Sequence, residues 1–148
     1  MKAYYSWDDV NGMMADITQQ MATKMLKPHV VLGPGRGGFP IGVMMSHYFD
    51  IPFHGFEWQT RDGEVQNSNQ LRQLLSKYNG KRVVIIDDIN DTGETFNYIK
   101  NNFGGEDKVR TASIIHNTPS NFKDLDYYCY EIDKRVVPCG IVFPWEEW

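Results

Sequence analysis

Two adjacent acids, Asp87 and Asp88, follow an apolar run at positions 83–86. Such a run is typical of a strand buried on both faces of a parallel sheet, and ligands bind beyond the carboxyl ends of such strands. Two neighbouring carboxylates repel each other unless a metal ion or hydroxyl donors offset the charge. Vicinal sugar hydroxyls together with Mg²⁺ would satisfy both acids.

A polar turn follows the acids and precedes a helix expected over about 95–102. The turn consists of Asp91, Thr92, Gly93, Glu94 and Thr95. Backbone N–H groups at the N-terminal end of a helix favour a bound anion, glycine permits close backbone approach, and threonine hydroxyls add neutral donors. Acids for a ribose followed at once by a phosphate site fit a ribose 5-phosphate. The alternative without a ligand is a buried strand and a capped helix, with Asp91 as the N-cap.

A glycine-rich segment, Gly33 to Gly38, reads GPGRGG and follows the β-branched run at 29–32. Its backbone N–H groups can surround an anion, and Arg36 adds a charge with bidentate geometry. By itself the segment fits equally well a tight connection between a strand and a helix.

Hydrophobic periodicity predicts the elements that position these segments. A capping-box-like pair, Ser6 and Asp9, opens an amphipathic helix expected to end at Leu26, with its methionines as core residues. Strands are expected at 29–32, 51–56, 82–88, 109–116 and 127–132, and further helices at 39–48, 70–78 and 95–102. The alternation predicts an α/β fold: a doubly wound, mostly parallel sheet flanked by helices, with right-handed crossovers.

The same pattern predicts how the chain is organised. Residues 1–148 are expected to form a single domain, since this length suits one core and is too short for two. The run at 82–88 is expected to be the central strand, the polar stretch 59–69 a mobile loop, and the aromatic tail 140–148 a small C-terminal hood.

Composition limits the classes of partner. The net charge is −4 and no Lys/Arg-rich run is present, which argues against a nucleic-acid partner. No stretch approaches the roughly 20 apolar residues of a membrane span and the first residues form no apolar signal segment, so a cytoplasmic protein without membrane contact is expected. Cys129 and Cys139 are expected to be reduced and receive no chemical role.

The segment Val83 to Phe96 closely resembles the phosphoribosyl-pyrophosphate motif of type I phosphoribosyltransferases. The order of segments from Tyr5 onward is similar to that of the xanthine-guanine group of this family. The resemblance implies that Asp87 and Asp88 hold the ribose hydroxyls, with Mg²⁺ at Asp88. It implies also that the turn 91–95 holds the 5-phosphate, and that Asp91 acts as base toward the N7 proton of a purine.

By the same resemblance, the glycine-rich segment corresponds to the family's pyrophosphate loop. The residues implied in pyrophosphate binding are Gly35, Arg36, Gly37 and Gly38, and Arg36 would stabilise the leaving group. That loop often holds a non-proline cis peptide, for which the Gly35–Arg36 bond is the candidate here. The stretch 58–69 corresponds to a flexible loop that covers the reacting centre, where exclusion of water would protect the reacting sugar.

The tail IVFPWEEW resembles the hood of the xanthine-guanine group, which implies a 6-oxopurine acceptor and a homodimer or homotetramer. Two positions depart from that group. Gly140 stands where relatives carry an aromatic residue that stacks on the base, next to Ile141, whose backbone groups would read the purine edge. Asn117 and Thr118 stand where relatives carry a lysine that reads the 6-oxo group, although the Asn117 amide can still donate to a carbonyl oxygen.

These departures leave three interpretations of the sequence open. The first is transfer of a phosphoribosyl group from phosphoribosyl pyrophosphate to a purine. The second is the same reaction with a pyrimidine or another acceptor. The third is a non-catalytic regulator that binds the sugar phosphate and has lost the base site. The tail aromatics themselves alternatively close a hydrophobic edge or a dimer surface.

Overall fold

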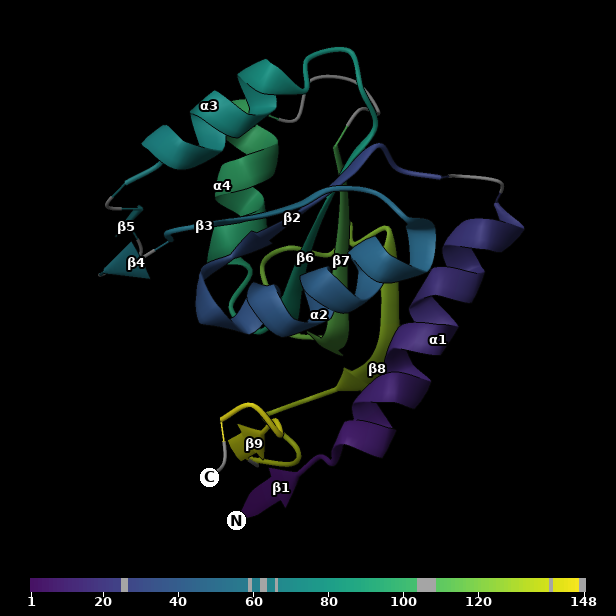
Figure 1. Cartoon of the computed structure of the whole chain (residues 1–148). Coiled ribbons are helices and arrows are strands. Elements are labelled where there is room, and N and C mark those ends of the chain that lie inside the picture. The colour runs from purple at the N-terminus through teal and green to yellow at the C-terminus, as the bar shows by residue number, and fades with distance from the viewer. Residues whose placement is uncertain are drawn as a thin grey trace.

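The computed structural model describes residues 1–24, 27–58, 60–61, 64–65, 67–103, 109–138 and 140–146. Its elements are β1 (Lys2–Tyr4), α1 (Trp7–Thr23), β2 (Val30–Pro34), α2 (Gly35–Phe49), β3 (Phe53–Phe56), β4 (Thr60–Arg61), β5 (Glu64–Val65), α3 (Asn69–Lys77), β6 (Val83–Asn90), α4 (Glu94–Phe103), β7 (Val109–Asn117), β8 (Tyr127–Ile132) and β9 (Gly140–Val142). The main sheet has the order β3-β2-β6-β7-β8, and every neighbouring pair in it is parallel. The predicted α/β fold is confirmed, with β6 as the central strand (Figure 1).

Helices cover both faces of this sheet, as Figure 1 shows, with α1 and α2 on one side and α3 and α4 on the other. Successive side chains of β6 enter different cores: Val84 and Ile86 pack with α1 and α2, whereas Val83 and Ile85 pack with α3 and α4. Because side chains alternate along a strand, an unbroken apolar run supplies both cores at once. This explains why the apolar run at 83–86 lies at the centre of the fold.

Helix α1 begins as expected at a reciprocal cap. The backbone N–H of Asp9 donates to Oγ of Ser6 at 3.0 Å, and the backbone N–H of Ser6 donates to Oδ2 of Asp9 at 2.8 Å. Met13, Met14 and Met21 are buried in the core beneath the helix, which confirms their packing role. The helix ends at Thr23, and residues 25–26 of the predicted helix lie outside the described residues.

The glycine-rich segment differs from the expectation of a loop. Strand β2 continues to Pro34 and helix α2 begins directly at Gly35, four residues before the expected start at Phe39. Close packing permits this: a Cβ on Gly33 would stand 2.6 Å from the carbonyl oxygen of Gly38. The expected cis peptide at Gly35–Arg36 is also wrong, because that bond is trans. The candidate anion site is therefore the first turn of a helix.

The polar stretch expected as a mobile loop contains two short strands. β4 and β5 pair antiparallel, with Thr60 opposite Val65, and α3 begins at Asn69. Positions 59, 62–63 and 66 lie outside the described residues. That this stretch moves over the site stays a prediction.

Strand β1 was not predicted, because three residues at the start of the chain carry too little pattern. It pairs parallel with β9, with Lys2 opposite Gly140 and Tyr4 opposite Val142. Phe143 stacks on Tyr5 at 5.8 Å between ring centroids and on Trp145 at 4.8 Å. The expected C-terminal hood is thus a two-stranded unit that both ends of the described chain build (Figure 1).

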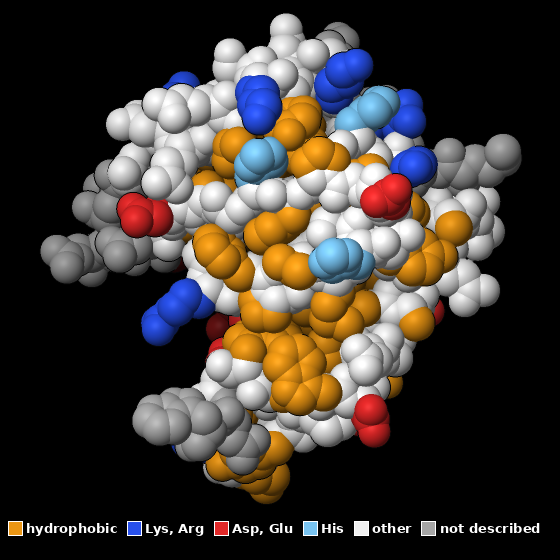
Figure 2. Space-filling model, viewed as in Figure 1, with side chains coloured by type: hydrophobic (Ala, Val, Ile, Leu, Met, Phe, Trp, Pro, Cys, Tyr) orange, Lys and Arg blue, Asp and Glu red, His pale blue; other side chains and the backbone are white. Residues whose placement is uncertain are grey.

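Apolar side chains reach the surface along α2, where Phe39, Val43 and Tyr48 are exposed. Figure 2 shows hydrophobic side chains gathered on the face that this helix covers. Exposed patches of this kind commonly mark interfaces, so this face is where the expected homo-oligomer contact would be sought. Within the described ranges no helix has the length and apolar character needed to cross a membrane.

Candidate functional site

A cavity of about 730 Å³ opens at the carboxyl ends of β2 and β6. This volume lies in the range of small-molecule binding sites. Its lining comes from the β2–α2 junction, the end of β6, the segment after β3, the start of α4 and the hood: Pro34, Gly35, Arg36, Gly37, Trp58, Asp87, Asp88, Thr95, Trp145 and Glu146. Six of the predicted site residues therefore meet in one cavity, namely Gly35, Arg36, Gly37, Asp87, Asp88 and Thr95.

The two acids at the end of β6 are half-buried and lie side by side. The backbone N–H of Asp88 donates to Oδ1 of Asp87 at 2.9 Å, and that of Ile89 donates to Oδ1 of Asp88 at 2.7 Å. Burial, followed by the charge of Asp88, raises the pKa of Asp87 well above its usual range. Burial also raises the pKa of Asp88, and the carboxylate of Glu146 adds to this rise. Ionisation of both acids would place two negative charges side by side, a state that a bound cation favours.

This donor set suits Mg²⁺. Among the described residues no lysine or arginine forms an ion pair with either acid, and no group of three or more potential ligands offers a complete protein cage. Mg²⁺ keeps several waters and is usually held by one or two carboxylates together with substrate phosphates. Asp88, with Asp87 beside it, would hold the ion in this way.

The first turn of α2 lies directly against these acids. A Cβ on Gly37 would stand 2.6 Å from Oδ2 of Asp88, and one on Gly38 would stand 2.7 Å from the carbonyl oxygen of Ile86. Only glycine allows the helix to approach β6 this closely. The free N–H groups and positive end of the helix dipole consequently point toward the cavity, and Arg36 from the same turn lines its wall.

The turn after β6 forms a smaller pocket of about 90 Å³, lined by residues 89–96. Gly93 adopts a φ of 92°, and a Cβ there would stand 2.6 Å from Oγ of Ser120. The pocket contains the four predicted turn residues Asp91, Thr92, Glu94 and Thr95 in addition to Gly93. Thr95 lines both this pocket and the large cavity, so the two compartments adjoin.

Buried polar groups that the sequence analysis did not single out support this turn. Asn90 is 1% exposed; its Nδ2 donates to the carbonyl oxygen of Phe122 at 2.8 Å, and its Oδ1 accepts from Oγ of Ser120 at 3.1 Å. The backbone N–H of Asn121 donates to the carbonyl oxygen of Thr92 at 2.9 Å. Asn90 and Ser120 are separated by 30 residues, and no local motif links them.

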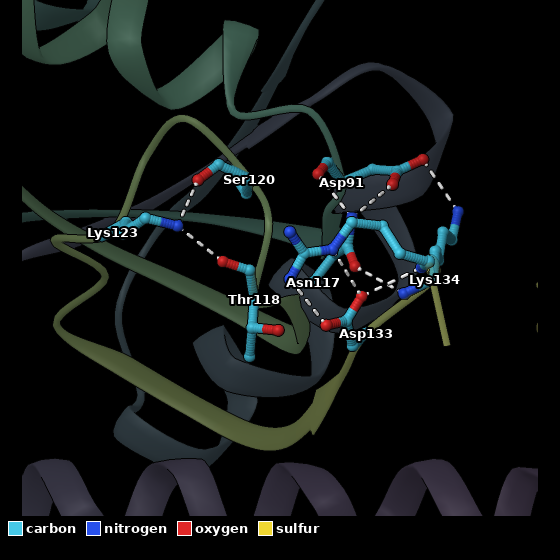
Figure 3. A network of polar contacts seen from close by, with 8 residues as sticks. Asp91, Asn117, Thr118, Ser120, Lys123, Asp133 and Lys134 are labelled. Atoms are coloured by element: carbon cyan, nitrogen blue, oxygen red, sulfur yellow. Dashed lines mark hydrogen bonds and ion pairs between the residues drawn. The ribbon is translucent and has the colours of Figure 1, made fainter. Parts of the chain in front are cut away.

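Asp91 lies in the polar network that Figure 3 shows. Nδ2 of Asn117 donates to its carbonyl oxygen at 3.0 Å and to Oδ1 at 3.2 Å. Nζ of Lys134 lies 2.8 Å from Oδ2. The Asn117 amide, considered from the sequence as a donor to the base, is thus bonded to Asp91, and the sequence analysis missed Lys134.

The remaining predicted base-site residues lie at the edges of this region. The backbone N–H of Thr118 donates to the carbonyl oxygen of Ile132 at 2.8 Å, and its own carbonyl accepts from Nζ of Lys123 at 2.6 Å (Figure 3). Gly140 and Ile141 lie in β9. From the hood, Trp145 and Glu146 reach the large cavity.

The fold and the paired acids followed by the 91–95 turn define a phosphoribosyltransferase domain. Residues 2–148 match the phosphoribosyl transferase domain family, and the chain belongs to this family.

Several phosphoribosyltransferases are similar to this chain over most of their length. A hypoxanthine-guanine phosphoribosyltransferase of Streptococcus agalactiae is 23% identical over 151 residues, which cover 92% of this chain and 81% of that protein. The structure of a purine phosphoribosyltransferase from Pyrococcus horikoshii OT3 is 26% identical with a TM-score of 0.76, covering 99% and 95% of the two chains. A Helicobacter pylori xanthine-guanine-hypoxanthine phosphoribosyltransferase, 16% identical, has the same fold at a TM-score of 0.76, with coverage of 99% and 93%.

Proposed function

We propose that the protein transfers the 5-phosphoribosyl group of phosphoribosyl pyrophosphate to a 6-oxopurine, with Mg²⁺, as a purine-salvage reaction. The observation that carries this proposal is the arrangement along β6 and its turn. Asp87 and Asp88 line a large cavity, the 91–95 turn forms a phosphate-sized pocket beside it, and Asp91 stands at the start of that turn. The similar transferases named above act on purines according to their names.

In this proposal each part of the site has a separate task. The acids hold the ribose hydroxyls and, at Asp88, the ion, which supplies electrostatic stabilisation of the pyrophosphate. The 91–95 turn holds the 5-phosphate through backbone N–H groups and threonine hydroxyls. Gly35, Arg36, Gly37 and Gly38, in the first turn of α2, bind the pyrophosphate, and the Arg36 guanidinium stabilises its growing charge.

The reaction exchanges one bond at the anomeric carbon of the sugar. The bond to the pyrophosphate oxygen breaks and its electron pair leaves with pyrophosphate, while a purine ring nitrogen forms the new bond. The purine gives up its N7 proton to the Asp91 carboxylate. General-base catalysis of this kind contributes typically about 10²- to 10⁴-fold to a rate.

A base panel tests the proposal. The chain is incubated with phosphoribosyl pyrophosphate, Mg²⁺ and guanine, xanthine, hypoxanthine, adenine, uracil or orotate, and pyrophosphate release is measured. Turnover with the oxopurines is expected. Saturable binding of phosphoribosyl pyrophosphate without release of pyrophosphate for any base would instead establish a regulator. Release of pyrophosphate with a pyrimidine alone would show that the acceptor is a pyrimidine and not a purine.

A single variant tests the role of Asp91. Asp91→Ala is expected to lower kcat by roughly 10²-fold or more while the affinity for phosphoribosyl pyrophosphate changes little, because the carboxylate acts on the base. Undiminished turnover in this variant would remove Asp91 from the mechanism. Asp133→Ala is the matched control, since that acid belongs to the neighbouring turn and pairs with Arg135.

A further inference from the structure

The pocket formed by the 91–95 turn contains acidic residues and no basic one. Its lining comes from residues 89–96, in which Asp91 and Glu94 carry charge and no lysine, arginine or histidine occurs. A phosphate monoester held there would carry a negative charge of about 1.5 to 2 at neutral pH. The pocket is therefore expected to bind its anion through backbone N–H groups and hydroxyls alone, against the charge of neighbouring carboxylates.

The two acids of the pocket differ in their partners. The Asp91 carboxylate accepts from Nδ2 of Asn117 at 3.2 Å and lies 2.8 Å from Nζ of Lys134 (Figure 3). Among the described residues no lysine or arginine forms an ion pair with Glu94. Lys134 thus offsets the charge of Asp91, whereas no such ion pair offsets the charge of Glu94 in that part of the chain.

Glu94 stands where a helix favours an anion. It is the first residue of α4 and the acid in the first turn of that helix, and it is half-buried. The free N–H groups and the positive end of the helix dipole stabilise a negative charge at this position. A bound 5-phosphate would use the same groups. The Glu94 carboxylate consequently takes part of the stabilisation that the phosphate would otherwise receive.

We propose that Glu94 competes electrostatically with the 5-phosphate for the positive end of α4, which weakens the binding of both the sugar-phosphate substrate and the nucleotide product. The inference rests on the proposed function and concerns the strength of binding at that same site. A carboxylate and a phosphate in one pocket of about 90 Å³ lie within the distance of about 8 Å over which charges interact at physiological ionic strength. Glu94 therefore limits the affinity and favours release of the product.

The experiment compares Glu94→Gln, which keeps the size of the side chain and removes its charge, with Asp8→Asn. Asp8 is an acid in the first turn of α1 and belongs to the lining of neither the large cavity nor the turn pocket. Each variant loses a favourable charge at a helix N-terminus, but only Glu94→Gln alters the pocket. The dissociation constants of phosphoribosyl pyrophosphate, ribose 5-phosphate and pyrophosphate are measured by calorimetry at ionic strengths of about 0.01 M and about 1 M, where the Debye length falls from about 30 Å to about 3 Å.

Glu94→Gln is expected to bind phosphoribosyl pyrophosphate and ribose 5-phosphate roughly 3- to 10-fold more tightly than the wild type at low ionic strength, and this gain should shrink at high ionic strength. Its affinity for pyrophosphate, which the proposed function assigns to the first turn of α2, should change little. Asp8→Asn should bind all three ligands as the wild type does. Both variants should melt roughly 1 to 4 °C lower than the wild type, since each loses a charge that stabilises a helix.

Equal or weaker binding of the two 5-phosphates by folded Glu94→Gln, or a gain that does not depend on ionic strength, would overturn the competition and leave the proposed function standing. Glu94 would then only stabilise the start of α4. A wild-type protein that binds neither phosphoribosyl pyrophosphate nor ribose 5-phosphate at either ionic strength would instead overturn the phosphate site of the proposed function, and this inference with it.

Discussion

Gly37 and Asp88 approach each other so closely that a Cβ on the glycine would stand 2.6 Å from Oδ2 and 2.8 Å from Cγ of the acid. Real Cβ atoms essentially never lie this close to another heavy atom. The first turn of α2 and the end of β6 therefore share one surface of the cavity. The groups proposed for pyrophosphate and those proposed for the ribose and Mg²⁺ are held in fixed relation by this contact.

Gly37→Ala is expected to weaken the affinity for phosphoribosyl pyrophosphate by roughly 10-fold or more, because the new methyl group displaces the Asp88 carboxylate or the helix turn. Isothermal titration in the presence of Mg²⁺ measures this directly. Gly12→Ala is the control, since Gly12 lies in α1 and a Cβ there meets no atom within 4 Å. That variant should bind normally and gain up to about 1 kcal/mol in unfolding free energy, since alanine suits a helix better. An unchanged affinity of Gly37→Ala for phosphoribosyl pyrophosphate would contradict the inference that the first turn of α2 and the end of β6 share one surface of the binding cavity.

The paired acids predict a conflict between stability and binding. Asp87→Asn removes one of two adjacent carboxylates whose burial is unfavourable, so the free energy of unfolding at neutral pH should rise, on the order of 1 kcal/mol. The same change should abolish Mg²⁺-dependent binding of phosphoribosyl pyrophosphate. Chemical denaturation and calorimetry provide the two readouts. A variant that is less stable than the wild type would show that the pair is structural and that its repulsion is offset within the protein.

Trp58 orients a hydroxyl that the phosphate site is expected to use. Its Nε1 donates to Oγ1 of Thr95 at 3.2 Å, so the Thr95 hydroxyl accepts from the indole and keeps its own proton for a ligand. Trp58→Phe preserves most of the ring contact with Phe56 and Tyr98 but removes this donor. The affinity for phosphoribosyl pyrophosphate is expected to fall roughly 3- to 10-fold, the value of one ordinary hydrogen bond. If variant and wild type bind phosphoribosyl pyrophosphate with equal affinity, Trp58 contributes only packing contacts.

The sequence predicted those parts of the protein whose cause is local. The apolar run specifies β6, and the Ser6–Asp9 pair specifies the start of α1. The glycine-rich segment was expected as a loop because glycine disfavours helices, yet packing of its first turn against β6 decides otherwise. Lys134 was missed because it is 43 residues from Asp91. The order of the strands brings Lys134 and Asp91 together, and the spacing of residues along the chain does not predict this contact.

His116 is expected to make the support of the 91–95 turn sensitive to acid. Nδ2 of Asn90 lies 3.1 Å from its Nδ1. Because the same amide group donates to Phe122 and its oxygen accepts from Ser120, the amide orientation is fixed and Nδ1 must be an acceptor on a neutral ring. Burial lowers the pKa of His116 from 6.5, Lys123 lowers it further, and Glu131 opposes the shift. The ring of Tyr128 packs against the imidazole.

A lowered pKa in the folded chain means that the unfolded chain takes up the proton first as the pH falls. The stabilising contribution of the neutral ring is present above about pH 6.5 and is lost as the pH falls through that value toward the lower pKa of the folded state. The glutamine side chain in His116→Gln does not titrate. As the pH falls from about 7.5 to about 5.5, the free energy of unfolding of the wild type should therefore decrease relative to that of this variant. Denaturant unfolding of both proteins across that range gives the difference curve. A flat difference curve would mean that the histidine keeps its ordinary pKa and that Asn90 holds the turn without it.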